Sequence, residues 1–115
     1  MTDKHITIAK ADGTWVVRAA GAVVGESAQA LELRERGHDP VIYFPRDDIE
    51  MAFFDASDHR STCPHKGEAS YFSLVAKSGT IPNIAWSYET PLEGVARIKD
   101  HLAFYTGEKL AVEKL

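Results

Sequence analysis

The sequence lacks several features that would place the protein in a specialised class. It contains one cysteine, Cys63, among 115 residues, which excludes an internal disulfide framework and a zinc site built from paired cysteines. No apolar run approaches the roughly 20 residues that cross a bilayer, and the opening MTDKHITIAK has no apolar core of a signal peptide. We therefore expect a cytoplasmic protein with no membrane partner.

Positive charge is also scarce. Lysine and arginine total 13 against 17 acidic residues, so the formal net charge is −4. A nucleic-acid-binding protein normally carries a basic stripe, and we expect no nucleic-acid partner. The 44% of hydrophobic and 26% of charged residues are ordinary for a folded protein and exclude disorder. The length predicts a single domain over residues 1–115.

Short alternating segments separated by turn residues predict a mainly β fold. Asp12-Gly13 favours a tight hairpin turn between a strand at residues 6–8 and another at 14–20. Strands at this spacing are typical of all-β sandwiches and barrel-like folds. Further strands are expected at residues 22–24, 31–34, 41–44, 69–76, 82–88, 95–98, 101–105 and 110–112.

One short helical turn is expected near residues 45–53. Pro45 suits the first turn of a helix, and the acidic Asp47 and Asp48 suit the positive end of the helix dipole. Residues 51–54 fit a strand equally well. The segment from Asp55 to Arg60 is expected to be a polar loop.

The densest group of reactive side chains is HRSTCPHKGE, at residues 59–68. Cys63 is a candidate nucleophile, because a nearby cation such as Lys66 favours the thiolate, and Glu68 is a candidate proton acceptor. The alternative is that Cys63 is a small buried apolar residue, as most free cysteines are.

The same segment contains two imidazoles. His59, Cys63 and His65 offer the nitrogen and sulfur ligands of a zinc site, with His59 or His65 alternatively acting as a base for the thiol. The spacing lacks the second ligand pair of familiar zinc motifs. We assign no metal, and the alternative is that both histidines are solvated loop residues.

Two cations are candidate anion-binding groups. Arg46 offers a planar fork and Lys66 a point charge to a carboxylate or phosphate. A salt bridge, for example between Arg46 and Glu68, is the structural alternative. Asp48, next to Asp47, is a candidate ligand-binding residue through a divalent ion.

Aromatic residues near these segments predict a pocket wall. Tyr71, Trp86 and Tyr88 are candidates, with Tyr43 from an earlier strand. The alternative is that they form part of the core, because aromatic side chains supply much of the apolar burial. Their hydroxyl and indole N–H groups still need polar partners, and Asn83 is one candidate.

Three blocks of the sequence resemble the domain of unknown function 427 (DUF427) family. They are Tyr43-Phe44-Pro45-Arg46-Asp47-Asp48, the run from Thr62 to Tyr71, and Asn83-Ile84-Ala85-Trp86-Ser87-Tyr88. The resemblance covers roughly residues 15–106. It implies a compact domain of two antiparallel sheets, similar to the β-tent (Mss4-like) architecture, as found in small bacterial or fungal proteins.

Some members of that family are labelled nucleotidyltransferase-like. Two-metal nucleotidyl transfer needs carboxylates arranged around a pair of ions about 4 Å apart. The usual motif is Gly-Ser followed by spaced aspartates, whereas this chain has the adjacent pair Asp47-Asp48. The residues therefore argue against that activity.

These observations predict that the protein binds a small anionic molecule. The cleft is expected between the turn at residues 45–48, the loop at 63–68 and the aromatic wall, with Arg46 and Lys66 holding the negative group and Glu68 orienting Lys66. The sequence identifies no cofactor. Two alternatives remain: an enzyme with Cys63 as nucleophile, and a homodimeric interaction module that pairs through an edge strand.

Overall fold

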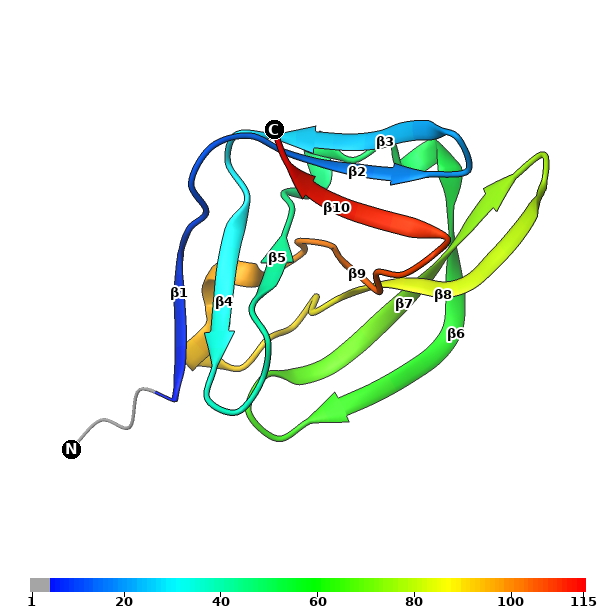
Figure 1. Ribbon diagram of the computed structural model, residues 1–115. Coiled ribbons are helices and arrows are strands. Elements are labelled where there is room, and N and C mark those ends of the chain that lie inside the picture. Colours follow the sequence, from blue (N-terminus) through cyan, green and yellow to red (C-terminus); the bar gives the residue numbers. More distant parts are fainter. Residues whose placement is uncertain (1–4) are drawn as a thin grey trace.

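The computed structural model describes residues 5–115, and most of them lie in strands (Figure 1). None of the helical segments in this range is long and apolar enough to cross a membrane. In chain order, the elements are β1 (Ile6–Lys10), β2 (Trp15–Ala19), β3 (Ala22–Ser27), β4 (Leu31–Glu35), β5 (Val41–Tyr43), η1 (Arg46–Asp48), η2 (Met51–Phe53), β6 (Phe54–Cys63), β7 (Gly67–Ala76), β8 (Gly79–Ser87), η3 (Glu93–Ile98), β9 (Ala103–Phe104) and β10 (Leu110–Lys114), where η denotes a 3-10 helix.

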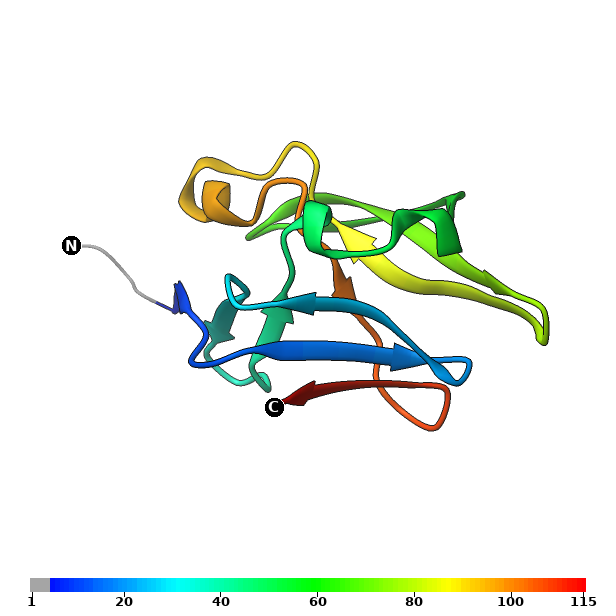
Figure 2. The same cartoon turned by 90° about the horizontal axis from the view of Figure 1, so that it is seen from above.

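The strands form three antiparallel sheets, with the orders β1-β4-β5, β10-β2-β3 and β6-β7-β8-β9. Figure 2 shows the last of these as one layer, with the other two sheets side by side beneath it. The predicted mainly β fold is confirmed. The strands divide into three sheets where two were expected, and the β-tent architecture stays a prediction.

The first four strands are a single long hairpin that bends in the middle. β1 pairs with β4 and β2 pairs with β3, and the N–H of Ala11 continues the ladder at the bend by donating to the carbonyl of Ala30 at 2.9 Å. The chain reverses at Ala20 and Gly21, which both have positive φ, as the tight hairpin turn requires. The prediction of a hairpin turn at Asp12-Gly13 was wrong, because these residues lie at the bend and serve to turn the chain from one sheet into the next.

Two other segments differ from the predictions. The expected polar loop at 55–60 lies within β6, where pairing with β7 is interrupted by an irregular register between Ala56 and Arg60. Most of its side chains face solvent, so the polar composition does not oppose strand formation. The expected strand at 95–98 is the helical segment η3, which buries Val95 and Ile98 at helical spacing. The short helical turn near 45–53 is confirmed as η1 and η2.

Two clusters of buried side chains form the core. The larger cluster includes Phe44, Phe72 and Phe104. The smaller cluster includes Tyr43, Tyr71 and Tyr88. The two sheets that contain β5 and β9 are joined by a pair of hydrogen bonds between Phe44 and Leu102, at 2.8 and 2.9 Å. This junction fixes β5 against the sheet that carries the aromatic residues.

Candidate functional site

A cavity of about 500 Å³ lies over the smaller core cluster, between the sheet β1-β4-β5 and the sheet β6-β7-β8-β9. All four tyrosines of the chain line it, together with the single cysteine. We call it the tyrosine cavity. Its lining residues are Leu33, Glu35, His38, Asp39, Val41, Tyr43, Cys63, His65, Lys66, Tyr71, Trp86, Tyr88 and Tyr105.

Strand alternation places the aromatic side chains on one wall. Successive side chains of a strand point to opposite faces, so residues two apart share a face. Val41 and Tyr43 are related in this way on β5, and both line the cavity. Tyr71 of β7 lies directly opposite Trp86 of β8 in the ladder, and cross-strand partners share a face.

Most of the polar groups of this wall bond to one another. The indole N–H of Trp86 donates to the hydroxyl oxygen of Tyr43 at 3.2 Å. The hydroxyl of Tyr71 shares a hydrogen bond of 2.8 Å with Ser61 and one of 3.5 Å with Tyr105. The predicted need of the tyrosine and tryptophan side chains for polar partners is therefore met largely among themselves.

Tyr88 is the exception in this wall. Its side chain is 6% exposed, yet its hydroxyl makes no hydrogen bond with any residue in the described range 5–115. Burial raises the pKa of Tyr88 far above its ordinary value, and burial likewise raises the pKa of Tyr43 to about 12. Both phenols are therefore protonated at neutral pH, and Tyr88 has a free donor at the cavity.

A nearly buried ion pair lies at the edge of the cavity. Nζ of Lys66 donates to Oε1 of Glu35 at 2.8 Å, and the two side chains are only 11% and 12% exposed. This hydrogen bond lowers the pKa of Glu35 below its usual range, against the opposing effect of desolvation. Lys66 was expected to be oriented by Glu68, but its carboxylate partner comes from the end of β4.

Cys63 also faces the cavity and is half-buried. Its sulfur makes no hydrogen bond with any of the residues that the structure describes. His59, one of the two expected bases, makes an edge contact with the ring of Tyr71 at 4.5 Å, and His65 contacts the ring of His5 at 4.4 Å. Neither histidine is hydrogen-bonded to the thiol, which a preformed nucleophile–base pair would show.

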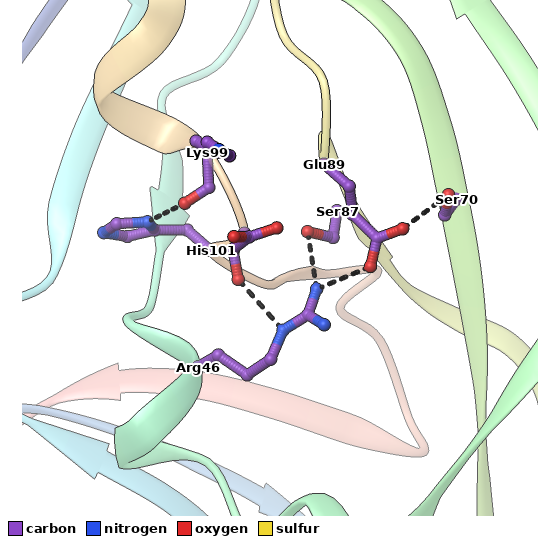
Figure 3. A network of polar contacts seen from close by, with 7 residues as sticks. Arg46, Ser70, Ser87, Glu89, Lys99 and His101 are labelled. Atoms are coloured by element: carbon purple, nitrogen blue, oxygen red, sulfur yellow. Dashed lines mark hydrogen bonds and ion pairs between the residues drawn. The ribbon is translucent and has the colours of Figure 1, made fainter.

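Arg46 is part of a separate polar network, which Figure 3 shows. Its Nη2 donates to the hydroxyl of Ser87 at 3.0 Å and to Glu89 at 3.1 Å, and its Nε donates to the carbonyl of Asp100 at 3.1 Å. The guanidinium also lies 5.3 Å from the centre of the Phe72 ring. These contacts tie η1 to the end of β8 and to the chain that follows η3.

The expected joint position of Arg46 and Lys66 in one cleft is therefore not what the structure has. Arg46 is absent from the lining of the tyrosine cavity, because its donors are directed to the network above. Arg46 does form a salt bridge, as the structural alternative predicted, but its acidic partner is Glu89 and not Glu68.

Three further candidate residues lie outside the cavity lining. Asp48 accepts a hydrogen bond of 2.5 Å from Ser27 and so ties η1 to β3. Glu68 is exposed on β7. Asn83 has a φ of 53° where the pairing of β7 and β8 shifts register, and its backbone N–H donates to Ser73 at 3.1 Å. Their ligand-binding roles stay predictions, without support from this cavity.

The structure also brings in residues that the sequence did not single out. Glu35 is in phase with the buried Leu31 and Leu33 on β4, and a carboxylate on the apolar face of a strand signals a buried partner. Tyr105, which follows β9, packs against Trp86 with ring centres 4.6 Å apart and the ring planes tilted by 47°. No local pattern indicates that contact, because the two residues meet only through the pairing of β8 with β9.

Metal-ligating atoms gather at one place within the described residues. They belong to His5, Glu35 and His65 and lie within 4.8 Å of one another. The trio considered from the sequence, His59, Cys63 and His65, does not gather in this way. His65 is common to both sets, but it lies in the turn between β6 and β7, where its ring contacts that of His5, just before β1.

Comparison with known families is consistent with the blocks noted in the sequence. No curated protein matches the chain significantly. The sequence profile of a domain of unknown function (DUF427) matches residues 7–114, a range that includes all strands except the first residue of β1 and all of the cavity lining. The chain therefore belongs to the DUF427 family.

Proposed function

We propose that the protein binds a small, ring-containing organic molecule in the tyrosine cavity. The observation that carries the proposal is that the free hydroxyl of Tyr88 and the ammonium group of Lys66 belong to one aromatic-lined cavity. Small-molecule sites are mostly apolar hollows with a few well-placed polar groups. The volume of about 500 Å³ lies in the range of roughly 300–1,000 Å³ typical of such sites.

The aromatic wall favours a flat ligand. The rings of Trp86 and Tyr105 lie 4.6 Å apart between centres and are tilted by 47° to each other, and Tyr43 meets Trp86 edge-on at 6.4 Å. Aromatic side chains pack best against other ring faces and edges. A planar ring of the ligand gains this contact without ordering flexible bonds on binding.

The charges at the cavity edge limit the ligand to at most one negative charge. Lys66 has three N–H donors and gives one of them to Glu35, so it retains donors for an acceptor group. Glu35 offsets its charge, and Asp39 adds a negative group to the lining. A carboxylate or carbonyl therefore fits better than a multiply charged phosphate, which would meet repulsion from both acids.

A thermal-shift screen of aromatic and heteroaromatic monocarboxylates tests the proposal. A ligand that binds only the folded state raises its stability by mass action, by about 2.7 kcal/mol at 100 times its Kd. We expect the shift to shrink in Tyr88→Phe, which removes one hydroxyl and retains the ring.

Lysine variants provide the matched comparison. Lys66→Met is expected to reduce the shift, whereas Lys77→Met, at an exposed position on the turn between β7 and β8, is expected to leave it unchanged. Binding that persists undiminished in both Tyr88→Phe and Lys66→Met would contradict the proposal. So would a screen in which no compound of this class raises the melting temperature.

A further inference from the structure

We propose that His5, Glu35 and His65 form a binding site for one divalent transition-metal ion, with Zn²⁺ as the best match. Two imidazoles and one carboxylate offer ligand atoms that all lie within 4.8 Å of one another. Two histidines and one glutamate are also the protein ligands of one class of zinc site, in which a fourth position stays open. The evidence for this site does not depend on the proposed organic ligand.

The distances are close to those that a single ion requires. Ligand atoms about 2.0–2.2 Å from a tetrahedral zinc ion lie roughly 3.3–3.6 Å from one another. Nε2 of His5 is 3.6 Å from Oε2 of Glu35. The rings of His5 and His65 are 4.4 Å apart between centres and inclined by 74°, so small side-chain rotations bring a nitrogen of each toward a common point.

The carboxylate is already oriented by a neighbour. Lys66 holds Oε1 of Glu35 at 2.8 Å, which leaves Oε2 on the side of His5. Metal-ligating carboxylates are usually held in turn by hydrogen bonds from neighbouring groups. An ordinary His5–Glu35 ion pair would account for one of these contacts, but it does not require the second imidazole.

The three residues come from distant parts of the chain. His5 precedes β1, Glu35 ends β4, and His65 lies in the turn between β6 and β7. A bound ion would therefore join the sheet β1-β4-β5 to the sheet β6-β7-β8-β9. Glu35 and His65 also line the tyrosine cavity, so the open coordination position is within reach of water or of a molecule in that cavity.

Calorimetric titration of the full chain with ZnCl₂ alone, after chelator treatment and desalting, tests the site. We expect one ion per chain and a rise in melting temperature on adding zinc. His65→Ala is expected to weaken binding by at least about 10-fold, since even outer groups of metal sites contribute that much. His65 is exposed in a turn, so this variant should fold, and His5→Ala should reproduce its effect.

His59→Ala is the matched control, because it removes an exposed imidazole outside the cluster. We expect wild-type affinity from this variant. Co²⁺ as a probe should give the strong visible absorption of a tetrahedral site in the wild type and lose it in His65→Ala. No saturable zinc binding, binding that survives in both His5→Ala and His65→Ala, or an equal loss in His59→Ala would each overturn the proposal.

Discussion

Nζ of Lys66 lies 2.8 Å from Oε1 of Glu35, a residue 31 positions earlier in the chain. The pair joins the turn between β6 and β7 to the end of β4, and both side chains are nearly buried. It therefore sets the separation of the two sheets at the edge of the tyrosine cavity.

Breaking this pair on one side should destabilise the fold. Lys66→Met leaves the Glu35 carboxylate poorly solvated, with the His5 ring at 3.6 Å as its remaining ion-pair partner, and we expect a loss of about 1–3 kcal/mol in the free energy of unfolding. Glu35→Gln should behave similarly. The double variant should lose less than the sum of the two single losses, as urea denaturation of all four proteins would show. Strict additivity would mean that the two residues do not interact.

Arg46 should act on stability rather than on ligand binding. Arg46→Ala removes bonds to Ser87, Glu89 and the carbonyl of Asp100, and we expect it to cost about 1–2 kcal/mol, a modest figure because the ion pair is partly exposed. Lysine cannot reproduce the fork, so Arg46→Lys should recover little of this.

The comparison of unfolding with ligand binding distinguishes the two roles of Arg46. The ligand-induced thermal shift of Arg46→Ala should match that of the wild type. A variant with normal stability and no ligand response would restore the binding role that the sequence suggested.

The sequence predicted what could be inferred locally. Alternating apolar residues located most strands, and the aromatic residues Tyr43, Tyr71, Trp86 and Tyr88 line one cavity. Charge pairing was not predictable. Lys66 bonds to Glu35, which belongs to a different sheet, and not to Glu68, which is only two positions away in the sequence. Lys66 lies in the turn between β6 and β7, outside the strand that carries Glu68, so closeness in sequence was a poor guide to partners.

The bend of the first hairpin was missed for a related reason. Asp12-Gly13 is a strong sequence signal for a tight turn, and Ala20-Gly21 is a weaker one. The chain nevertheless reverses at Ala20-Gly21. Turn residues indicate that the chain changes direction, but they do not indicate whether it bends or reverses fully. That Asp12-Gly13 is only a bend follows from the pairing of β1 with β4, which is a non-local contact.

Alkaline pH should destabilise the protein through its buried phenols. The pKa of Tyr43 is raised to about 12 and that of Tyr88 is raised as well, against about 10 in the unfolded chain. The unfolded state therefore releases these protons first, so their contribution to stability is complete below pH 10 and is lost as the pH rises from 10 toward 12.

Urea unfolding at pH 8, 10 and 11 measures this loss, and absorbance at 295 nm follows phenolate formation. Tyr88→Phe should show a smaller loss of stability between pH 8 and 11 than the wild type. Titration of all four tyrosines together near pH 10, with no extra loss of stability, would contradict the described burial.

The turn that carries His65 and Lys66 depends on the glycine after it. Gly67 has a φ of 110°, and an added Cβ would meet the carbonyl of Thr90 at 3.4 Å. Gly67→Ala should therefore cost about 1–3 kcal/mol, the usual range for such backbone strain. Gly94→Ala, where an added Cβ would meet no atom within 4 Å, is the matched control, and equal losses in the two variants would be inconsistent with strain at Gly67.

Cys63 should report occupancy of the cavity. Its thiol is half-buried among the lining residues, so a bound aromatic carboxylate should slow its alkylation by iodoacetamide. The rate is measured by mass spectrometry with and without a compound from the screen. An unchanged rate under saturating compound would place the compound elsewhere on the protein.

The most direct test of ligand binding in the tyrosine cavity uses the two indole N–H signals of the ¹⁵N-labelled protein. Trp86 lines the tyrosine cavity, whereas Trp15 is absent from its lining and borders a neighbouring hollow that Trp86 also borders. On titration with an aromatic monocarboxylate, the Trp86 signal should shift to saturation while the Trp15 signal stays in place. Shifts of both signals, or of Trp15 alone, would place the ligand in the neighbouring hollow and contradict the account.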